Sequence, residues 1–163
     1  MICLVLMMVM LSGCTAEVYE TMGNVVHVGQ MEAAMRQIVL EFPEEATVLT
    51  GSGTDVIYTC HDYTMSLHNF PSGNIAETIR VLCGYDVQQL TVIETSCGDH
   101  KRYEWVWVAA GEAGDVLCRG AVLDDGNYHY GLCVSAEAEQ AAALREEWSN
   151  LFASFCLSAG EEV

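Results

Sequence analysis

The side chains best suited to chemistry are cysteines and histidines, of which the 163-residue chain has eight and five. Cys97 and His100 stand three residues apart, a spacing at which a turn brings a thiolate and an imidazole to one metal ion. They are weak candidates, because a structural zinc site needs four such ligands and no paired C-x-x-C motif is present. Cys60 and His61 are adjacent in a predicted strand, so their side chains point to opposite faces. We therefore expect no metal or other cofactor.

Catalysis by a nucleophile needs a base within reach and a group that orients the base. The sequence contains no G-x-S-x-G or H-E-x-x-H motif, and the glycine-rich stretch 51–55 lacks the lysine of a phosphate-binding loop. No catalytic residue is assigned, and we expect a protein without catalysis of its own. A small hydrolase that uses His100 or His129 is an alternative, as is a metal-binding protein with Cys and His ligands.

The first residues carry a second kind of chemistry. Ile2 to Leu11 are apolar and uncharged. This stretch is too short for a helix that spans a bilayer, which needs ~20 residues, but it is typical of the core of a secretion signal. The following Leu11-Ser12-Gly13-Cys14 resembles a bacterial lipobox, which implies a signal peptide at 1–13, a lipid on Cys14 and a tether at 14–29. Secretion signals usually open with Lys or Arg, and none precedes Cys14, so we expect the natural chain to start further upstream.

Charge and composition exclude several partners. Twenty-three acidic residues against six Lys and Arg give a net charge of −17, which disfavours nucleic acid, and simple adhesion to anionic lipid. A hydrophobic fraction of 52% with 18% charged residues indicates a folded domain. With the lipid anchor, this predicts a protein held at the cell membrane and facing outside the cytoplasm.

Apart from Cys3 and Cys14, six cysteines remain, and an even number is typical of a disulfide framework. All six stand in apolar runs, however, where cysteine also occurs as a free, buried thiol. In the hairpin around Asp125-Gly126, a two-residue turn would pair Cys118 with Cys133, whereas a three-residue loop would separate them. We favour the longer loop, because it gives a fully apolar inner face, with Tyr130 inward and His129 outward. The redox state stays open for Cys60, Cys83, Cys97, Cys118, Cys133 and Cys156.

Hydrophobic periodicity predicts one α+β domain over 30–163, an antiparallel meander flanked by N-terminal, middle and C-terminal helices. The first helix covers Gln30 to Glu41, the second runs from an Asn74 cap to Gly84, and the third begins at a Ser135 cap. The buried stripe of the third helix comprises Ala141, Leu144, Trp148, Leu151, Phe152 and Phe155. Strands are expected at 46–50, 55–60, 63–69, 90–95, 101–110, 116–123 and 128–135.

An aromatic strand is the best candidate for a binding surface. Tyr103, Trp105 and Trp107 alternate onto one face, and His129 is expected to point outward nearby. If exposed, these side chains suit a peptide or a sugar. In the alternative, the two tryptophans pack beneath the last helix and bind nothing.

Three stretches carry a resemblance to a known fold: Leu82-Cys83-Gly84-Tyr85-Asp86, the hairpin Asp125 to Tyr130, and the closing 151–155. Together with the order of elements, they resemble the PsbP-like α/β/α sandwich of small bacterial lipoproteins, extrinsic photosystem proteins and a Ran-binding import factor, over Gln30 to Leu157. The resemblance implies a binding or accessory module of the cell envelope with an unknown protein, peptide or sugar partner. It supplies no catalytic set.

Overall fold

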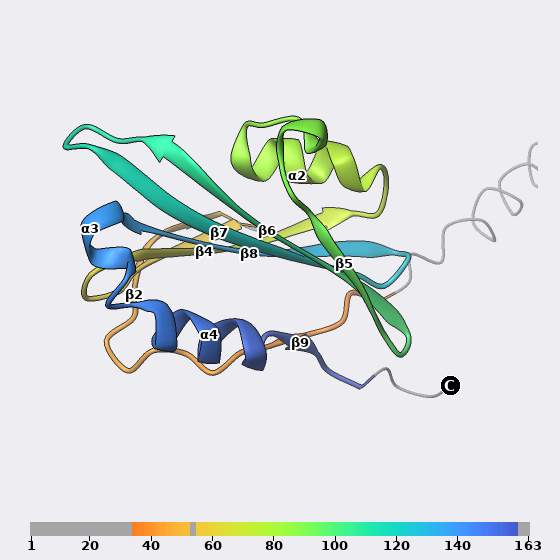
Figure 1. Cartoon of the computed structure of the whole chain (residues 1–163). Coiled ribbons are helices and arrows are strands. Elements are labelled where there is room, and N and C mark those ends of the chain that lie inside the picture. Colours follow the sequence, from red (N-terminus) through yellow and green to blue (C-terminus); the bar gives the residue numbers. More distant parts are fainter. Residues whose placement is uncertain (1–33, 53–54, 160–163) are drawn as a thin grey trace, which may run out of the picture. The chain divides into compact units, whose positions relative to one another are not determined.

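The computed structural model describes residues 34–52 and 55–159. Its main element is a seven-stranded antiparallel sheet with the strand order β2-β3-β4-β8-β7-β6-β5 (Figure 1). Two meanders form the sheet, β2–β4 and β5–β8, and they join where β8 pairs with β4. The strands are β2 (Thr47–Ser52), β3 (Asp55–Thr59), β4 (Thr64–Pro71), β5 (Ile93–Cys97), β6 (His100–Ala110), β7 (Asp115–Asp124) and β8 (Tyr128–Glu137).

Helices cover both faces of this sheet. Helix α2 (Ile75–Cys83) lies on one face, and α3 (Ala138–Ala141) with α4 (Arg145–Ser154) lies on the other (Figure 1). A short 3-10 turn, η1 (Val87–Gln89), follows α2, and β1 (Ile38–Val39) pairs with β9 (Cys156–Leu157) as a separate two-stranded sheet. The predicted α+β class with an antiparallel sheet is confirmed. The predicted signal peptide, Cys14 and the tether lie outside the described residues.

Helix α2 has the ends that its sequence predicts. The Asn74 side chain accepts a hydrogen bond from the backbone N–H of Ala76 at 3.0 Å, which satisfies a donor that the first turn leaves free. Gly84 ends the helix with a φ of 79°, a left-handed conformation that glycine adopts without a Cβ clash. Both caps therefore confirm the predicted boundaries.

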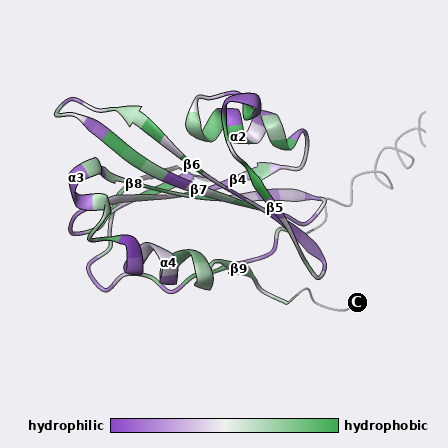
Figure 2. Cartoon of the chain, viewed as in Figure 1, coloured by the Kyte–Doolittle hydropathy of each residue, from purple (hydrophilic) through white to green (hydrophobic). Residues whose placement is uncertain are grey.

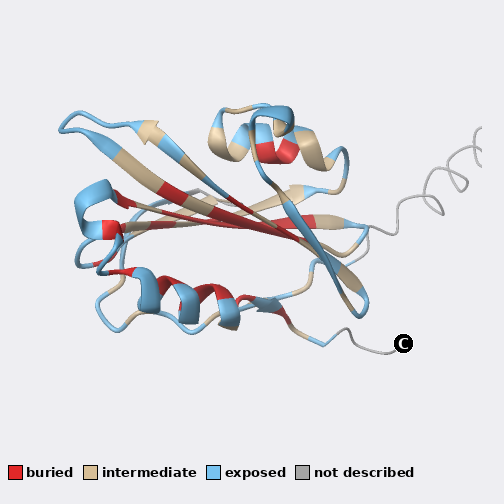
Figure 3. Cartoon of the chain, in the orientation of Figure 1, coloured by how far each residue is buried: buried red, intermediate tan, exposed pale blue. Residues whose placement is uncertain are grey.

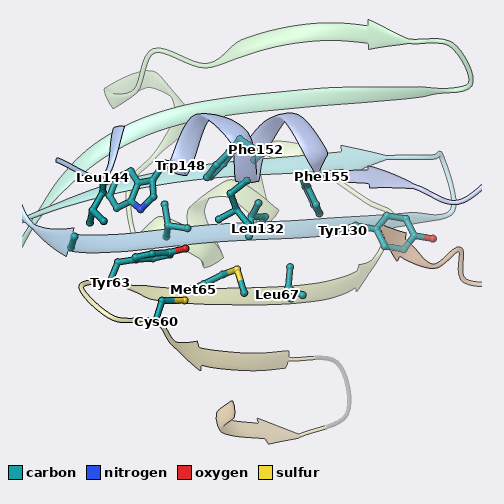
Figure 4. Close-up of a cluster of buried hydrophobic side chains, with 14 of the residues drawn as sticks. Cys60, Tyr63, Met65, Leu67, Tyr130, Leu132, Leu144, Trp148, Phe152 and Phe155 are labelled. Atoms are coloured by element: carbon teal, nitrogen blue, oxygen red, sulfur yellow. The ribbon is translucent and has the colours of Figure 1, made fainter. Parts of the chain in front are cut away.

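The larger core lies between the sheet and α4 (Figure 4). The predicted stripe from Ala141 to Phe155 is confirmed, and all six of its members are buried. The start of the helix differs from the prediction, because β8 continues to Glu137 and Ser135 remains within the strand. The helical segment is also interrupted at 142–144, so it forms a four-residue α3 and a ten-residue α4.

The smaller core lies beneath α2 and contains both tryptophans of the aromatic strand. Trp105 is 2% exposed and packs with Ile79 and Val122, and the Trp107 ring lies 6.0 Å from that of Trp105. A Cβ on Gly120 would lie 2.5 Å from the Trp105 ring, so the absence of a side chain there makes room for the indole. The tryptophans thus pack beneath the middle helix, and not beneath the last helix as the alternative interpretation expected.

The β7–β8 hairpin has neither of the two registers considered. Asp124 pairs with His129 across a four-residue loop, so Cys118 lies opposite Ser135. Asp124 and Asp125 set this loop, because their carboxylates accept the backbone N–H groups of residues 126, 127 and 128 at 2.7–2.9 Å. His129 points to the face opposite Tyr130, as expected, but α2 covers that face, so His129 is buried instead of directed outward to solvent.

The predicted N-terminal helix is wrong over its described part. Residues 34–37 have no regular structure, and Ile38–Val39 is a strand whose partner, Cys156–Leu157, is far away in sequence. Ile38 and Leu40 still pack against the larger core, which explains their apolar character. Arg36 fixes this segment further by donating to the carbonyl of Ser158 at 2.9 Å and to the carboxylate of Asp99 at 2.7 Å.

Candidate functional site

A groove of about 400 Å³ opens where α3 and α4 meet the far ends of β6 and β7. Val106 and Leu117 form its floor together with Arg119. The opposite wall comes from the interrupted helical segment and consists of Ala138, Ala141, Ala142, Arg145, Trp148 and Ser149. Apart from the two arginines and Ser149, the lining of the groove is mostly apolar.

The groove exists because the helical cover ends before the sheet does. Helix α4 packs on β4, β8 and the middle of β7, whereas the β6–β7 hairpin projects beyond it (Figures 1 and 3). Val106 and Val108 on that hairpin are 54% and 50% exposed, and Figure 2 shows hydrophobic residues continuing into the projecting strands. The alanines of the wall are too small to fill the space between the helices and the strands.

Arg119 reaches the groove from a network that holds it rigidly. Its guanidinium lies 4.1 Å from the centre of the Phe152 ring and donates to Glu104 at 2.9 Å. Glu104 also accepts from Arg102, which donates to the carbonyls of Phe152 and Phe155 near the end of α4 at 2.6 and 2.8 Å. Two arginines thus share one carboxylate, and the network keeps a net positive charge.

Burial alone would raise the pKa of Glu104, but hydrogen bonds from Arg119 and Arg102 outweigh that effect and lower the pKa below its usual value. The carboxylate therefore stays charged at neutral pH. Because both arginines bind it, the network fixes the position of Arg119 at the groove instead of cancelling its charge.

Arg145 is the second cation of the groove. It is exposed and forms no ion pair with any residue in the described ranges. It occupies the first turn of α4, where the helix dipole disfavours a positive charge. No acidic side chain lines the groove, although the chain has 23. Two of the six cations of the chain therefore line a groove whose lining contains no acidic side chain, although Arg119 also binds Glu104 beside it.

The residues proposed as a binding surface from the sequence lie mostly in the interior. Tyr103, Trp105 and His129 are 7%, 2% and 0% exposed, and Trp107 is partly buried in the core beneath α2. They gather on the α2 face of the sheet, as the alternation predicted for β6 requires. Closed packing leaves them unable to form an exposed aromatic surface.

His129 contacts Thr78 of α2 through a hydrogen bond of 2.7 Å between Nδ1 and the hydroxyl oxygen. Its Nε2 has no hydrogen-bond partner among the described residues and lies 3.6 Å from a carboxylate oxygen of Asp124. Burial lowers the pKa of His129, and the carboxylates of Asp124 and Asp125 oppose this shift without cancelling it. A hydroxyl, an imidazole and a carboxylate thus meet here, but the imidazole is sealed from solvent and from any substrate.

Cys97 and His100 face each other across the tight β5–β6 turn. The neighbouring Asp99 is occupied, because it pairs with His100 at 2.9 Å and with Arg36 at 2.7 Å. Within 34–52 and 55–159, no group of three or more potential ligands is arranged to hold a metal ion. The predicted pair therefore lacks a third ligand in this part of the chain.

The six cysteines within the described residues are free thiols. Burial raises the pKa of Cys118 to about 11 and that of Cys133 to about 12, with a smaller contribution from Cys83 to each shift. Because the thiolate is the reactive form, these two thiols are inert at neutral pH.

Sequence reasoning missed the groove. Its helical wall is an alanine-rich segment, and its two cations come from elements 20 or more residues apart. One local signal was present, since Arg145 follows the run Ala141–Leu144 at the point where a helix dipole favours anions. Its significance depends on the interruption of the helix, which the periodicity did not show.

No protein-family model matches the chain, and no curated protein matches its sequence. Solved structures do match. The cyanobacterial PsbP protein CyanoP of Synechocystis sp. PCC 6803 aligns with a TM-score of 0.54 at 10% identity, over 79% of this chain and 96% of that one.

LpqN of Mycobacterium tuberculosis, which is involved in cell envelope biogenesis, aligns with a TM-score of 0.52 at 10% identity, over 80% and 88% of the two chains. A protein from Bacteroides thetaiotaomicron aligns at 0.54 and 9% identity over 77% of this chain, but the match spans only 46% of the Bacteroides protein. At such identities the likeness concerns the fold alone, and the described part of this chain has a PsbP-like α+β fold.

Proposed function

We propose that this protein is a lipid-anchored binding module of the cell envelope, that it faces outside the cytoplasm, and that the groove beside α3 and α4 is its ligand site. The observation that carries the binding role is an apolar groove with two cations and no acidic lining in a strongly acidic protein. Envelope involvement of LpqN, which has the same fold, supports the location.

The anchor is proposed from the sequence. An apolar run followed by Leu11-Ser12-Gly13-Cys14 fits a secreted chain that carries diacylglycerol on Cys14, and two or three acyl chains hold a protein stably at a membrane. No helix in the described residues is long and apolar enough to cross a bilayer. In this proposal, the lipid on Cys14 attaches the chain to the membrane.

We propose further that the module carries out no catalysis. The arrangement closest to a catalytic triad among the described residues is Thr78, His129 and Asp124, and its imidazole is fully buried. The buried thiols of Cys118 and Cys133 are protonated at neutral pH because of their raised pKa values. Neither group provides the accessible, activated nucleophile that covalent catalysis needs.

Titration with N-phenyl-1-naphthylamine, a neutral apolar dye whose fluorescence rises in dry surroundings, tests the binding role. The full chain carrying Cys14→Ser, which removes the acyl chains, should bind it saturably. Ala142→Trp, at an exposed position of the wall, should weaken binding about tenfold or more by filling the groove. Val81→Trp, at an exposed position on α2, is the matched control and should bind normally. Equal binding by all three proteins would contradict the proposal.

Metabolic labelling with a radioactive fatty acid tests the anchor. The wild-type chain, expressed in a bacterium from its natural start, should take up label and sediment with membranes. Cys14→Ser should lose both properties, whereas Cys156→Ser, at an exposed cysteine near the C-terminus, should keep them. A Cys14→Ser protein that remains labelled and bound to membranes would refute the anchor.

A further inference from the structure

The charged groups that face the groove define the head group of its ligand. Both are guanidiniums, from Arg119 on β7 and Arg145 on α4, and a guanidinium donates hydrogen bonds but accepts none. Ser149, on the same wall, already donates its hydroxyl to the carbonyl of Arg145 at 2.7 Å. A ligand must therefore bring hydrogen-bond acceptors and negative charge to this end, as a carboxylate or a phosphate does.

The remaining surface defines the other end of the ligand. Val106, Leu117 and Ala142 offer apolar contacts, and the exposed Val108 next to Leu117 extends this surface along the hairpin. An extended peptide would leave its amide groups without partners on such a surface, at a cost for each buried amide. A bare aliphatic chain has no such groups, and about 400 Å³ is within the range of small-molecule sites, about 300–1,000 Å³.

We infer, on the basis of the binding role proposed above, that the groove binds an anionic amphiphile: one aliphatic chain that ends in a carboxylate or phosphate. The aliphatic chain lies on the apolar floor between β6 and the alanines of the helical wall. The head group lies between Arg119, which the network with Glu104 holds in position, and Arg145, which is free to close on it. A neutral molecule of the same length gains the apolar contacts alone.

Competition against N-phenyl-1-naphthylamine tests this head-group preference on the full chain with Cys14→Ser. Decanoate, decyl phosphate, decanol and decyltrimethylammonium are compared below the concentrations at which they form micelles. Decanoate or decyl phosphate should displace the dye at a several-fold lower concentration than decanol, and the better of the two identifies the head group. Decyltrimethylammonium should be the weakest, and added salt should reduce the preference for the anions.

Arg145→Gln supplies the decisive variant, because Arg145 is exposed and forms no ion pair in the described structure, so the protein should fold without it. This variant should bind the anions about three- to fivefold more weakly, as expected for the loss of a partly exposed ion pair, and its affinity for decanol should be unchanged. Arg80→Gln removes an exposed cation from α2 on the other face and should change neither.

Failure of this inference is distinguishable from failure of the proposed function. If decanol and decanoate compete equally, or if Arg145→Gln has no effect on the anions, the anionic head group is wrong although the groove remains an apolar site. If decyltrimethylammonium binds best, the assigned charge is reversed. If the dye fails to bind in the groove at all, both proposals are refuted.

Discussion

The two faces of the sheet hold different chemistry because they are covered differently. On one face, α2 and the residues after it close over Trp105 and seal His129 and two thiols beneath them. On the other, α4 covers a larger core but stops short, and the break from α3 leaves a groove with two cations. The imidazole of His129 and the thiols of Cys118 and Cys133 lie under the closed face, while the open groove is lined mostly by apolar residues together with two arginines. Helical cover therefore locates the candidate site better than residue chemistry does.

The largest expected effect is on the covered core of the α4 face. Phe152 is 1% exposed and stacks beneath Arg119, so Phe152→Ala should lower the free energy of unfolding by about 3–5 kcal/mol. Val106→Ala, at a 54% exposed position on the uncovered part of the same face, should cost about 0.5 kcal/mol or less. Urea denaturation measures both. Equal losses would mean that the hairpin is as well covered as the core.

Gly120→Ala tests the close packing beneath α2. The added methyl group would lie 2.5 Å from the Trp105 ring, so we expect a loss of about 1–3 kcal/mol from overpacking. Gly73→Ala is the control, because nothing lies within 4 Å of a Cβ at that position. Urea midpoints compare the two variants. A Gly120→Ala protein as stable as the wild type would show that the α2 face is loosely packed.

The sequence predicted those features of both faces that depend on local signals. Each of these signals depends on a few neighbouring residues: the helix caps at Asn74 and Gly84, and the periodic stripe up to Phe155. The structure confirms all of them. Prediction failed where a pattern had two interpretations. His129 and Tyr130 are both fully buried, so adjacent positions of β8 face two covered sides, and polarity could not distinguish the registers.

Other features depend on contacts between distant parts of the chain. The spacing of Ile38 and Val39 suits a helix, yet the segment pairs with Cys156–Leu157 at the other end of the domain. The groove depends on the length of β6 and β7 relative to the helices above them. No local pattern in the alanines or in Arg145 reports that difference in length.

The sealed imidazole should make stability depend on pH. Because burial lowers the pKa of His129, the unfolded chain takes up a proton near its ordinary value of about 6.5 while the folded protein resists protonation. Stability is therefore complete above that pH and falls as the pH drops below it, by at most about 1.4 kcal/mol per pH unit for one proton.

Urea titrations between pH 7.5 and 5 measure this dependence. His129→Gln should remove the part of the slope that belongs to His129. His61→Gln, at a side chain that is 79% exposed, should keep the wild-type slope. A His129→Gln protein with an unchanged slope would show that solvent reaches this face.

The smallest expected effect compares two exposed arginines on opposite faces. Arg80 lies in the last turn of α2 and pairs with Glu77, so the dipole of that helix favours it and Arg80→Gln should lower the melting temperature slightly. Arg145 lies in the first turn of α4, where the dipole opposes it, so Arg145→Gln should stabilise the protein by about 0.3–0.5 kcal/mol. Calorimetry measures the stability of both variants relative to the wild type. Changes in stability of opposite sign would mean that Arg145 costs stability, as expected of a residue that serves ligand binding. A loss of stability in both variants would mean that Arg145 is an ordinary structural cation.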